Sequence, residues 1–241
     1  MSKTPAATSD AADVNPHIAI EALNVTLSLG EGDARVDILK GIDLTIAEGS
    51  TVALLGPSGS GKSSLMAILS GLERATGGTV NIAGADFGKM NEDQLAIARR
   101  GRVGIVLQAF HLLPTMTAHE NVAVPLELDG TNDPFAIAAD ELTAVGLGDR
   151  LGHYPTQLSG GEQQRVAIAR AMAGRPSIIF ADEPTGNLDG ATGEIIIELL
   201  FDRQKATKAT LLMITHDPEL AKRCDRIIEL RDGLIEKDSA Q

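Results

Sequence analysis

Apolar and polar positions follow two different periods along this chain, and the periods predict where strands give way to helices. Apolar residues alternate loosely with polar ones between Ile18 and Ile46, around a turn-like GEGDA, which predicts antiparallel strands. The short apolar run TVALL, residues 51–55, ends at Gly56 as a buried strand would. Helical spacing follows in SSLMAILSGL, and Gly71 marks the expected end of that helix.

Residues from about 91 to 165 carry helical patterns and predict a helical insertion within an α/β core. After this range, SIIFAD and TLLMITH predict strands, whereas GEIIIELLFDRQ and PELAKRC predict helices. The chain closes with a predicted hairpin, RIIELRDGLIEK. Because strands and helices alternate, we expect a mainly parallel sheet. The predicted fold class is therefore α/β, with an N-terminal antiparallel β subdomain and a helical insertion subdomain.

Composition narrows the possible functions. The formal net charge of −12 disfavours non-specific binding to nucleic acid, because phosphates repel an acidic surface. The single cysteine, Cys224, excludes an internal disulfide, and we interpret it as a small buried apolar residue. Residues 1–16 predict a disordered tail without the apolar segment of a secretory signal. No stretch approaches the roughly 18 unbroken apolar residues of a bilayer span, so we expect no direct membrane insertion.

The sequence GPSGSGKS fits the pattern G-x-x-x-x-G-K-[ST], a loop that wraps nucleotide phosphates. Its glycines allow backbone angles that point several N–H groups at one anion, and the following helix adds the positive end of its dipole. Lys62 is expected to bind the β- and γ-phosphates, Ser63 to bind Mg²⁺, and Ser64 to lie near the α-phosphate. The predicted binding residues of this loop are Gly56, Pro57, Ser58, Gly59, Ser60, Gly61, Lys62, Ser63 and Ser64.

Two acidic residues end the apolar run SIIFADE. In this topology a carboxylate at the end of a buried strand lies beside the phosphate loop. Asp182 is expected to hold Mg²⁺ through water, and Glu183 to polarise the attacking water as general base. Such an acid pair is a weak signal alone, and its position after LSGGEQQR strengthens it.

LSGGEQQRVAIARA begins like a capped helix, because Ser159 and Glu162 have the spacing of a capping box. Gly160 and Gly161 keep side chains away from the first turn, so that an anion can approach closely. Capping alone favours an ordinary surface helix, whereas the full string favours a phosphate contact. The segment follows the phosphate loop by about 95 residues, and we expect the two to complete one site only between two molecules.

Together GPSGSGKS, Gln108, LSGGEQQR, ADEPTGNLD and His216 resemble the nucleotide-binding subunit of ATP-binding-cassette (ABC) transporters, over residues 18–237. The resemblance implies a P-loop NTPase core, an ATPase domain spanning residues 17–241, and ATP and Mg²⁺ as ligands. It also implies a homodimer that closes head-to-tail around two MgATP.

The resemblance assigns roles to individual residues. Residues 56–64 match the Walker A loop, Gln108 the Q-loop, and residues 186–189 the D-loop at the dimer seam. The implied catalytic residues are Glu183, His216 and Gln108, and the implied metal-binding residues are Ser63, Gln108 and Asp182. The implied contacts to the γ-phosphate of the opposite subunit are Ser159, Gly160, Gly161 and Glu162.

The sequences QAFHLLPTMTAHENVAVPLEL and ADEPTGNLD are similar to ABC ATPases of the lipoprotein-release and macrolide-export type, including the YbbA-like branch. This implies an integral membrane permease as partner and a peripheral location on the cytoplasmic face of the inner membrane. It also implies export or extraction of lipophilic substrates. The alternative is a regulatory ABC ATPase in a cell-division complex that activates wall hydrolases, whose sequence would look nearly the same. A DNA-repair or chromosome-organising ATPase is disfavoured, since long coiled coils separate the motifs of such proteins, whereas the gap here is about 95 residues without heptads.

The chain departs from the family pattern at the residue expected to stack on the adenine base. Cassette ATPases usually stack adenine on an aromatic ring before the Walker A loop, whereas no Phe, Tyr or Trp occurs here before Phe87, and Leu29 fills the expected place. A lost base stack costs on the order of 1–3 kcal/mol. We therefore expect phosphates and Mg²⁺ to dominate binding, with weaker discrimination between ATP and GTP.

Overall fold

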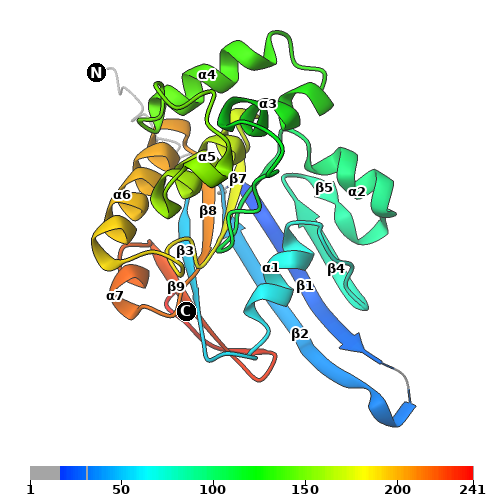
Figure 1. Ribbon diagram of the computed structural model, residues 1–241. Coiled ribbons are helices and arrows are strands. Elements are labelled where there is room, and N and C mark those ends of the chain that lie inside the picture. Colours follow the sequence, from blue (N-terminus) through cyan, green and yellow to red (C-terminus); the bar gives the residue numbers. More distant parts are fainter. Residues whose placement is uncertain (1–16, 31, 241) are drawn as a thin grey trace, which may run out of the picture.

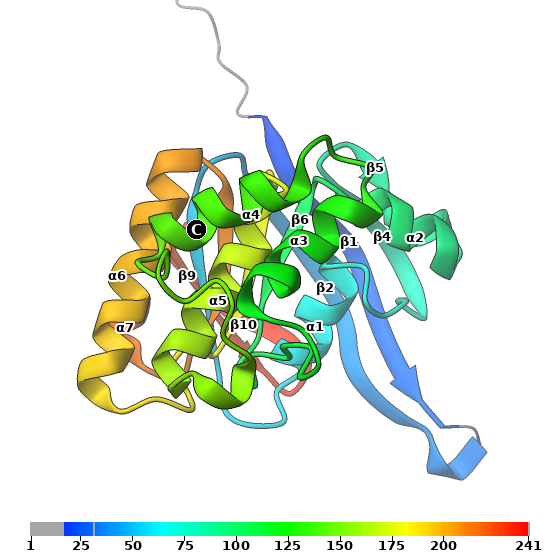
Figure 2. The ribbon, with the colours of Figure 1, turned by 45° about the horizontal axis from the view of Figure 1, so that its top comes forward.

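The computed structural model describes residues 17–30 and 32–240, which contain two β-sheets and the helices packed on them (Figure 1). The predicted disordered tail, residues 1–16, lies outside the described residues. The antiparallel sheet has the order β2-β1-β4-β5, with strands β1 (Ile18–Leu29), β2 (Val36–Ala47), β4 (Gly77–Ile82) and β5 (Ala85–Asp86). The β1–β2 hairpin projects from the body of the molecule (Figure 2). The predicted N-terminal antiparallel subdomain is confirmed.

The second sheet has the order β10-β9-β3-β8-β7-β6. Its strands are β3 (Thr51–Leu55), β6 (Val103–Val106), β7 (Ile178–Asp182), β8 (Thr210–Ile214), β9 (Arg226–Arg231) and β10 (Leu234–Asp238). All neighbours from β9 to β6 run parallel, and β10 pairs antiparallel with β9 as the predicted closing hairpin. The α/β fold with a mainly parallel sheet is therefore confirmed.

The apolar runs of the central strands reflect burial on both faces of the sheet. In β7, Ile178 and Phe180 join the core on the side of the antiparallel sheet, whereas Ile179 and Ala181 join the core under the helical side. Successive side chains of a strand point to opposite faces. A strand covered on both sides must therefore be apolar at every position, which explains why such runs marked the central strands in the sequence.

The helices divide between the two faces of the parallel sheet (Figures 1 and 2). Helices α3 to α6 contribute to the core on one face, and α1 packs with the antiparallel sheet on the other. The helices are α1 (Lys62–Leu69), α2 (Glu92–Arg99), α3 (Ala118–Leu128), α4 (Pro134–Ala144), α5 (Gly160–Ala173), α6 (Gly190–Thr207) and α7 (Pro218–Ala221). Among residues 17–30 and 32–240, no helix combines the length and apolar character needed to cross a bilayer.

The range 91–165 is not the purely helical insertion that its pattern predicts. Strand β6 lies within it and pairs with β7 in the parallel sheet. Helix α2 also belongs with the antiparallel sheet, because its Leu95 and Ala98 are buried in the core on that side. The prediction is wrong at β6 because an apolar run of four residues, VGIV, is too short to distinguish an edge strand from part of a helix. The helices that pack together as a group begin with α3.

Cys224 is buried as predicted, although it follows the short helix α7 rather than lying within a helix. Burial, and then the neighbouring charge of Asp225, raise the pKa of the Cys224 thiol to about 11. The thiolate is the nucleophilic form of cysteine, so this residue stays unreactive at neutral pH.

Candidate functional site

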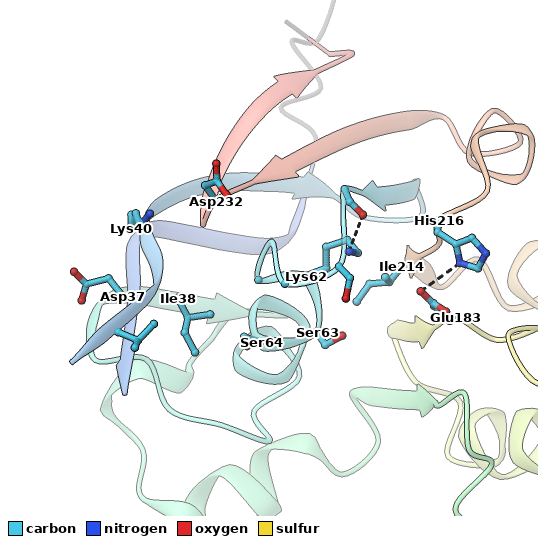
Figure 3. A pocket seen from close by; sticks show the side chains of 15 residues that line it. Asp37, Ile38, Lys40, Lys62, Ser63, Ser64, Glu183, Ile214, His216 and Asp232 are labelled. Atoms are coloured by element: carbon cyan, nitrogen blue, oxygen red, sulfur yellow. Dashed lines mark hydrogen bonds and ion pairs between the residues drawn. The ribbon is translucent and has the colours of Figure 1, made fainter. Parts of the chain in front are cut away.

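A cavity of about 770 Å³ lies beside the loop that joins β3 to α1 (Figure 3). It brings together parts of the chain that are far apart in sequence: the phosphate loop, the ends of β7 and β8, and strand β2. The loop lines it with Gly56, Ser58, Gly59, Gly61, Lys62, Ser63 and Ser64. The other lining residues are Val36, Asp37, Ile38, Lys40, Glu183, Ile214, His216 and Asp232.

The phosphate loop has the backbone that its glycines predict. Gly59 and Gly61 adopt left-handed φ angles of 80° and 99°. At Gly56 the chain passes so close to β9 that an added Cβ would lie 2.1 Å from the carbonyl oxygen of Leu230. Only glycine therefore fits there, and the loop is held in a tight arch between β3 and α1.

Lys62 is buried at the start of α1, with its ammonium group inside the arch. Its Nζ donates hydrogen bonds to the carbonyl oxygens of Gly56 and Pro57, each at 2.8 Å. Burial lowers the pKa of Lys62 below its ordinary value, while the charges of Glu183 and Asp182 oppose the shift. Ser60 is also buried, and its hydroxyl has no hydrogen-bond partner within the described residues. An anion in the arch would pair with the positive charge of the Lys62 ammonium, so the loop fits a phosphate.

Ser63 and Asp182 form the part of the site that suits a divalent cation. The Ser63 hydroxyl lies near the Asp182 carboxylate at the end of β7. Burial raises the pKa of Asp182 and the charge of Glu183 adds to this, whereas the Ser63 hydroxyl and the charge of Lys62 lower it. Hydroxyl and carboxylate oxygens are hard ligands, of the kind that Mg²⁺ binds together with water and phosphate oxygens. The residues present therefore fit Mg²⁺.

Glu183 follows Asp182 with a left-handed backbone, φ 41°, which the sequence did not reveal. For a residue other than glycine this conformation costs roughly 1–2 kcal/mol. It is held by two hydrogen bonds: the Glu183 N–H donates to the carbonyl of Ile214 at 3.0 Å, and its carbonyl accepts from the N–H of Gly186 at 2.9 Å. The turn directs the carboxylate into the cavity, where it lines the wall opposite the loop (Figure 3).

His216 follows β8 and meets Glu183 at the edge of the cavity. Its Nδ1 lies 3.4 Å from the Oε1 of Glu183, and its side chain is 73% exposed (Figure 3). An exposed imidazole is free to turn toward a ligand in the cavity. The structure therefore brings Lys62, Glu183 and His216 to one cavity.

Gln108 is not among the residues that line this cavity, within the described part of the chain. The Gln108 Nε2 donates to the Oδ1 of Asn187 at 3.5 Å, and the Asn187 Nδ2 donates to the main-chain carbonyl oxygen of Gln108 at 2.9 Å. A Cβ at Gly186 would lie 2.6 Å from this amide. The Q-loop segment therefore packs on residues 186–189. The sequence did not indicate this contact between the two motifs, although both residues that Gln108 meets, Gly186 and Asn187, lie in the motif ADEPTGNLD.

The segment Ser159–Glu162 forms the predicted capping box at the start of α5. The Ser159 N–H and hydroxyl each donate to Glu162 Oε2 at 2.8 Å, and these bonds lower the pKa of the Glu162 carboxyl. Gly161 is buried, and a Cβ there would lie 2.5 Å from the Cγ2 of Thr192. Its missing side chain thus allows α5 to pack closely on α6, and the expected approach of an anion to this turn stays a prediction. Within the described residues, none of the four lines the cavity.

A glycine arch after β3, with a buried lysine at a helix start and two carboxylates at the end of β7, two strands away in the same sheet, defines a P-loop nucleotide-binding domain. The chain belongs to the ABC transporter family, whose profile matches residues 39–186, and it is an ATPase of that family.

Similar proteins cover nearly the whole chain. The uncharacterized ABC transporter ATP-binding protein YbbA of Escherichia coli K12 is 46% identical over 91% of this chain and 97% of its own length. The lipoprotein-releasing system ATP-binding protein LolD 1 of Rhodospirillum rubrum is 45% identical over 91% of this chain and 98% of its own. The macrolide export ATP-binding/permease protein MacB of Marinobacter nauticus is 46% identical over 94% of this chain, which spans 35% of MacB.

A solved structure confirms the fold. The ATP-binding cassette MJ0796, in a dimeric post-hydrolysis state bound to ADP and Pi, superimposes with a TM-score of 0.84 at 39% identity. The match covers 91% of this chain and 97% of MJ0796.

Proposed function

We propose that two copies of this chain close head-to-tail around two MgATP and drive a membrane permease. The observation that carries the proposal is the division of the site: the cavity holds the phosphate loop, Glu183 and His216, whereas Ser159–Glu162 lies elsewhere on the same chain. A second copy, turned by a two-fold rotation, would place its Ser159–Glu162 segment over this cavity. The dimeric state of the similar cassette MJ0796 supports this arrangement.

Hydrolysis in the closed dimer follows from the residues that line the cavity. Glu183 accepts a proton from a water molecule, whose oxygen forms a bond to the γ-phosphorus as the bond to the β–γ bridging oxygen breaks. Lys62 stabilises the negative charge that builds on the phosphate oxygens, and His216 donates a hydrogen bond to the γ-phosphate. Ser63 and Asp182 would hold a bound Mg²⁺, which would supply positive charge to neutralise the phosphates. A contribution from Gln108 requires its amide to leave Asn187 as the dimer closes.

We further propose that the partner is an integral membrane permease and that the complex exports or extracts lipophilic molecules from the cytoplasmic face of the inner membrane. Support comes from the likeness to LolD and MacB, whose names state lipoprotein release and macrolide export. Mild detergent purification from membranes tests this. A permease that carries an export substrate supports the proposal, whereas one bound to a wall hydrolase favours the regulatory alternative.

The dimer proposal predicts that the ATPase rate per protomer depends on protein concentration. Diluting the protein below its dimer dissociation constant should lower the rate per protomer by roughly tenfold or more, because an isolated protomer lacks half of each site. Steady-state hydrolysis across a dilution series, with light scattering to follow the mass, measures this. A constant rate per protomer at concentrations where only monomers remain would contradict the proposal.

The part of the cavity that we expect to hold the nucleobase predicts weak selection among nucleotides. Val36 and Ile38 of β2 line it, and no lining residue in the described part is Phe, Tyr or Trp; exposed Leu29 pairs with Val36 on the hairpin but does not line the cavity. Aliphatic contacts do not discriminate between purines, and the stacking energy of an aromatic ring is lost. We expect ATP and GTP to compete for a fluorescent nucleotide within about fivefold of each other, and Val36→Tyr to tighten the binding of both. A much stronger preference of the unsubstituted protein for ATP would contradict this.

A further inference from the structure

Gln164 is a buried glutamine that the proposed mechanism does not use. It lies on α5, five residues after the N-cap Ser159, and is completely buried. Its Nε2 donates a 2.8 Å hydrogen bond to the carbonyl oxygen of Pro184. Its Oε1 is also buried and has no hydrogen-bond partner within the described residues.

The Gln164 side-chain amide is bonded through its Nε2 but not through its Oε1, and this difference indicates why a glutamine occupies the position. An unpaired buried acceptor destabilises a protein, and an apolar side chain of the same size would fill the space without that cost. The hydrogen bond to the Pro184 carbonyl is the one interaction that an apolar residue would lose. Gln164 is therefore explained by its contact with the turn at Glu183 rather than by packing.

The turn that receives this hydrogen bond carries the proposed general base. Pro184 directly follows Glu183, whose backbone is left-handed at φ 41°. Such a conformation persists only where its surroundings hold it in place. The Glu183 N–H and carbonyl are held by Ile214 and Gly186, and Gln164 holds the next carbonyl along the chain. Gln164 therefore completes the set of contacts that orient Glu183.

The same helix also carries the segment that would contact the partner's nucleotide. Gly161 packs closely on Thr192, and Gly160 lies near Leu188, so the first turn of α5 rests on residues 188–192 of its own chain. A shift of this turn would move the Gln164 amide with it. The contact of Gln164 with Pro184 thus joins the start of α5 to Glu183 through one buried hydrogen bond.

We propose that Gln164 is a positioning residue that links the two nucleotide sites of the dimer. On the proposed head-to-tail arrangement, on which this inference rests, Ser159–Glu162 of one protomer contacts the γ-phosphate held by the partner. Gln164 transmits the resulting position of α5 to Glu183 of its own protomer. Nucleotide bound at one site thereby orients the general base at the other, which is a source of positive cooperativity.

The test compares Gln164→Met with Gln204→Met. Gln204 is a matched control, because it is also buried and donates to two backbone carbonyls, of Gly49 and Ala209, away from the cavity. We expect Gln164→Met to lower kcat by roughly tenfold or more, to leave KM for MgATP within about threefold, and to reduce the Hill coefficient toward 1. Gln204→Met should keep the kcat and Hill coefficient of the unsubstituted protein.

Two results would overturn the inference: an unchanged kcat and Hill coefficient in Gln164→Met, or an equal loss of both in Gln204→Met. If Gln164→Met does not fold, Gln164→Asn replaces it, since its amide is one methylene too short to reach Pro184. Failure of the dimer proposal looks different, because the unsubstituted protein would then hydrolyse ATP without cooperativity and at a rate per protomer independent of concentration.

Discussion

Replacing Glu183 with glutamine is expected to abolish turnover while nucleotide binding persists. The substitution keeps the shape of the side chain and its place beside His216, but an amide cannot accept the proton of the attacking water. Loss of a general base typically lowers the rate by about 10²–10⁴-fold. Because the γ-phosphate would then remain in place between the two protomers, MgATP should trap Glu183→Gln as a dimer.

Steady-state phosphate release and gel filtration with and without MgATP measure the two effects. Glu198→Gln is the matched control, since this glutamate pairs with Arg223 at the surface and its side chain is 64% exposed. Glu198→Gln should hydrolyse ATP normally and show no added trapping. Normal hydrolysis by Glu183→Gln would show that the general base is another group.

Lys62→Ala is expected to act at an earlier step, on nucleotide binding itself. The Lys62 ammonium is the positive side chain buried within the phosphate arch, where it is bonded to two loop carbonyls. Charge-assisted hydrogen bonds contribute about 1.5–3 kcal/mol each, so losing the contact to phosphate should weaken the affinity for MgATP roughly 10- to 100-fold. Hydrolysis should fall with it.

Equilibrium binding of a fluorescent ATP analogue tests this, with Lys89→Ala as the control. Lys89 is an exposed lysine that pairs with Asp86, so its removal changes the net charge by the same amount at a different place. If charge alone mattered, both variants would weaken binding equally. Affinity of Lys62→Ala equal to that of the unsubstituted protein would refute the role of Lys62 in the arch.

Much of the site could be read from short stretches of sequence, because the chemistry of each stretch is local. The arch of GPSGSGKS depends on the φ angles of its own glycines, and the capping box of LSGGEQQR joins residues three apart. The central strands were recognisable since burial on both faces demands an unbroken apolar run. The short edge strand β6 was not predicted, because four residues are too few to show the hydrophobic period of a strand.

Contacts between distant motifs could not be predicted, since sequence spacing says nothing about which loops meet. Gln108 and Asn187 are 79 positions apart and exchange hydrogen bonds. The left-handed backbone of Glu183 is set by Ile214 on the neighbouring strand, so no local rule predicts it. The lining of the cavity is another case: Leu29 does not line it within the described residues, whereas Val36 and Ile38 of β2 do.

Residue types and short-range geometry were enough to predict that this chain folds around a phosphate loop, and to predict which lysine, hydroxyl and carboxylates belong to the site. How these groups face one another became visible only in the folded chain. The tertiary structure showed that Lys62 and Glu183 share a cavity, that Gln108 rests on Asn187, and that Gln164 reaches Pro184 from α5. These arrangements depend on how the helices pack against the parallel sheet, and such packing is a property of the whole chain rather than of any one segment.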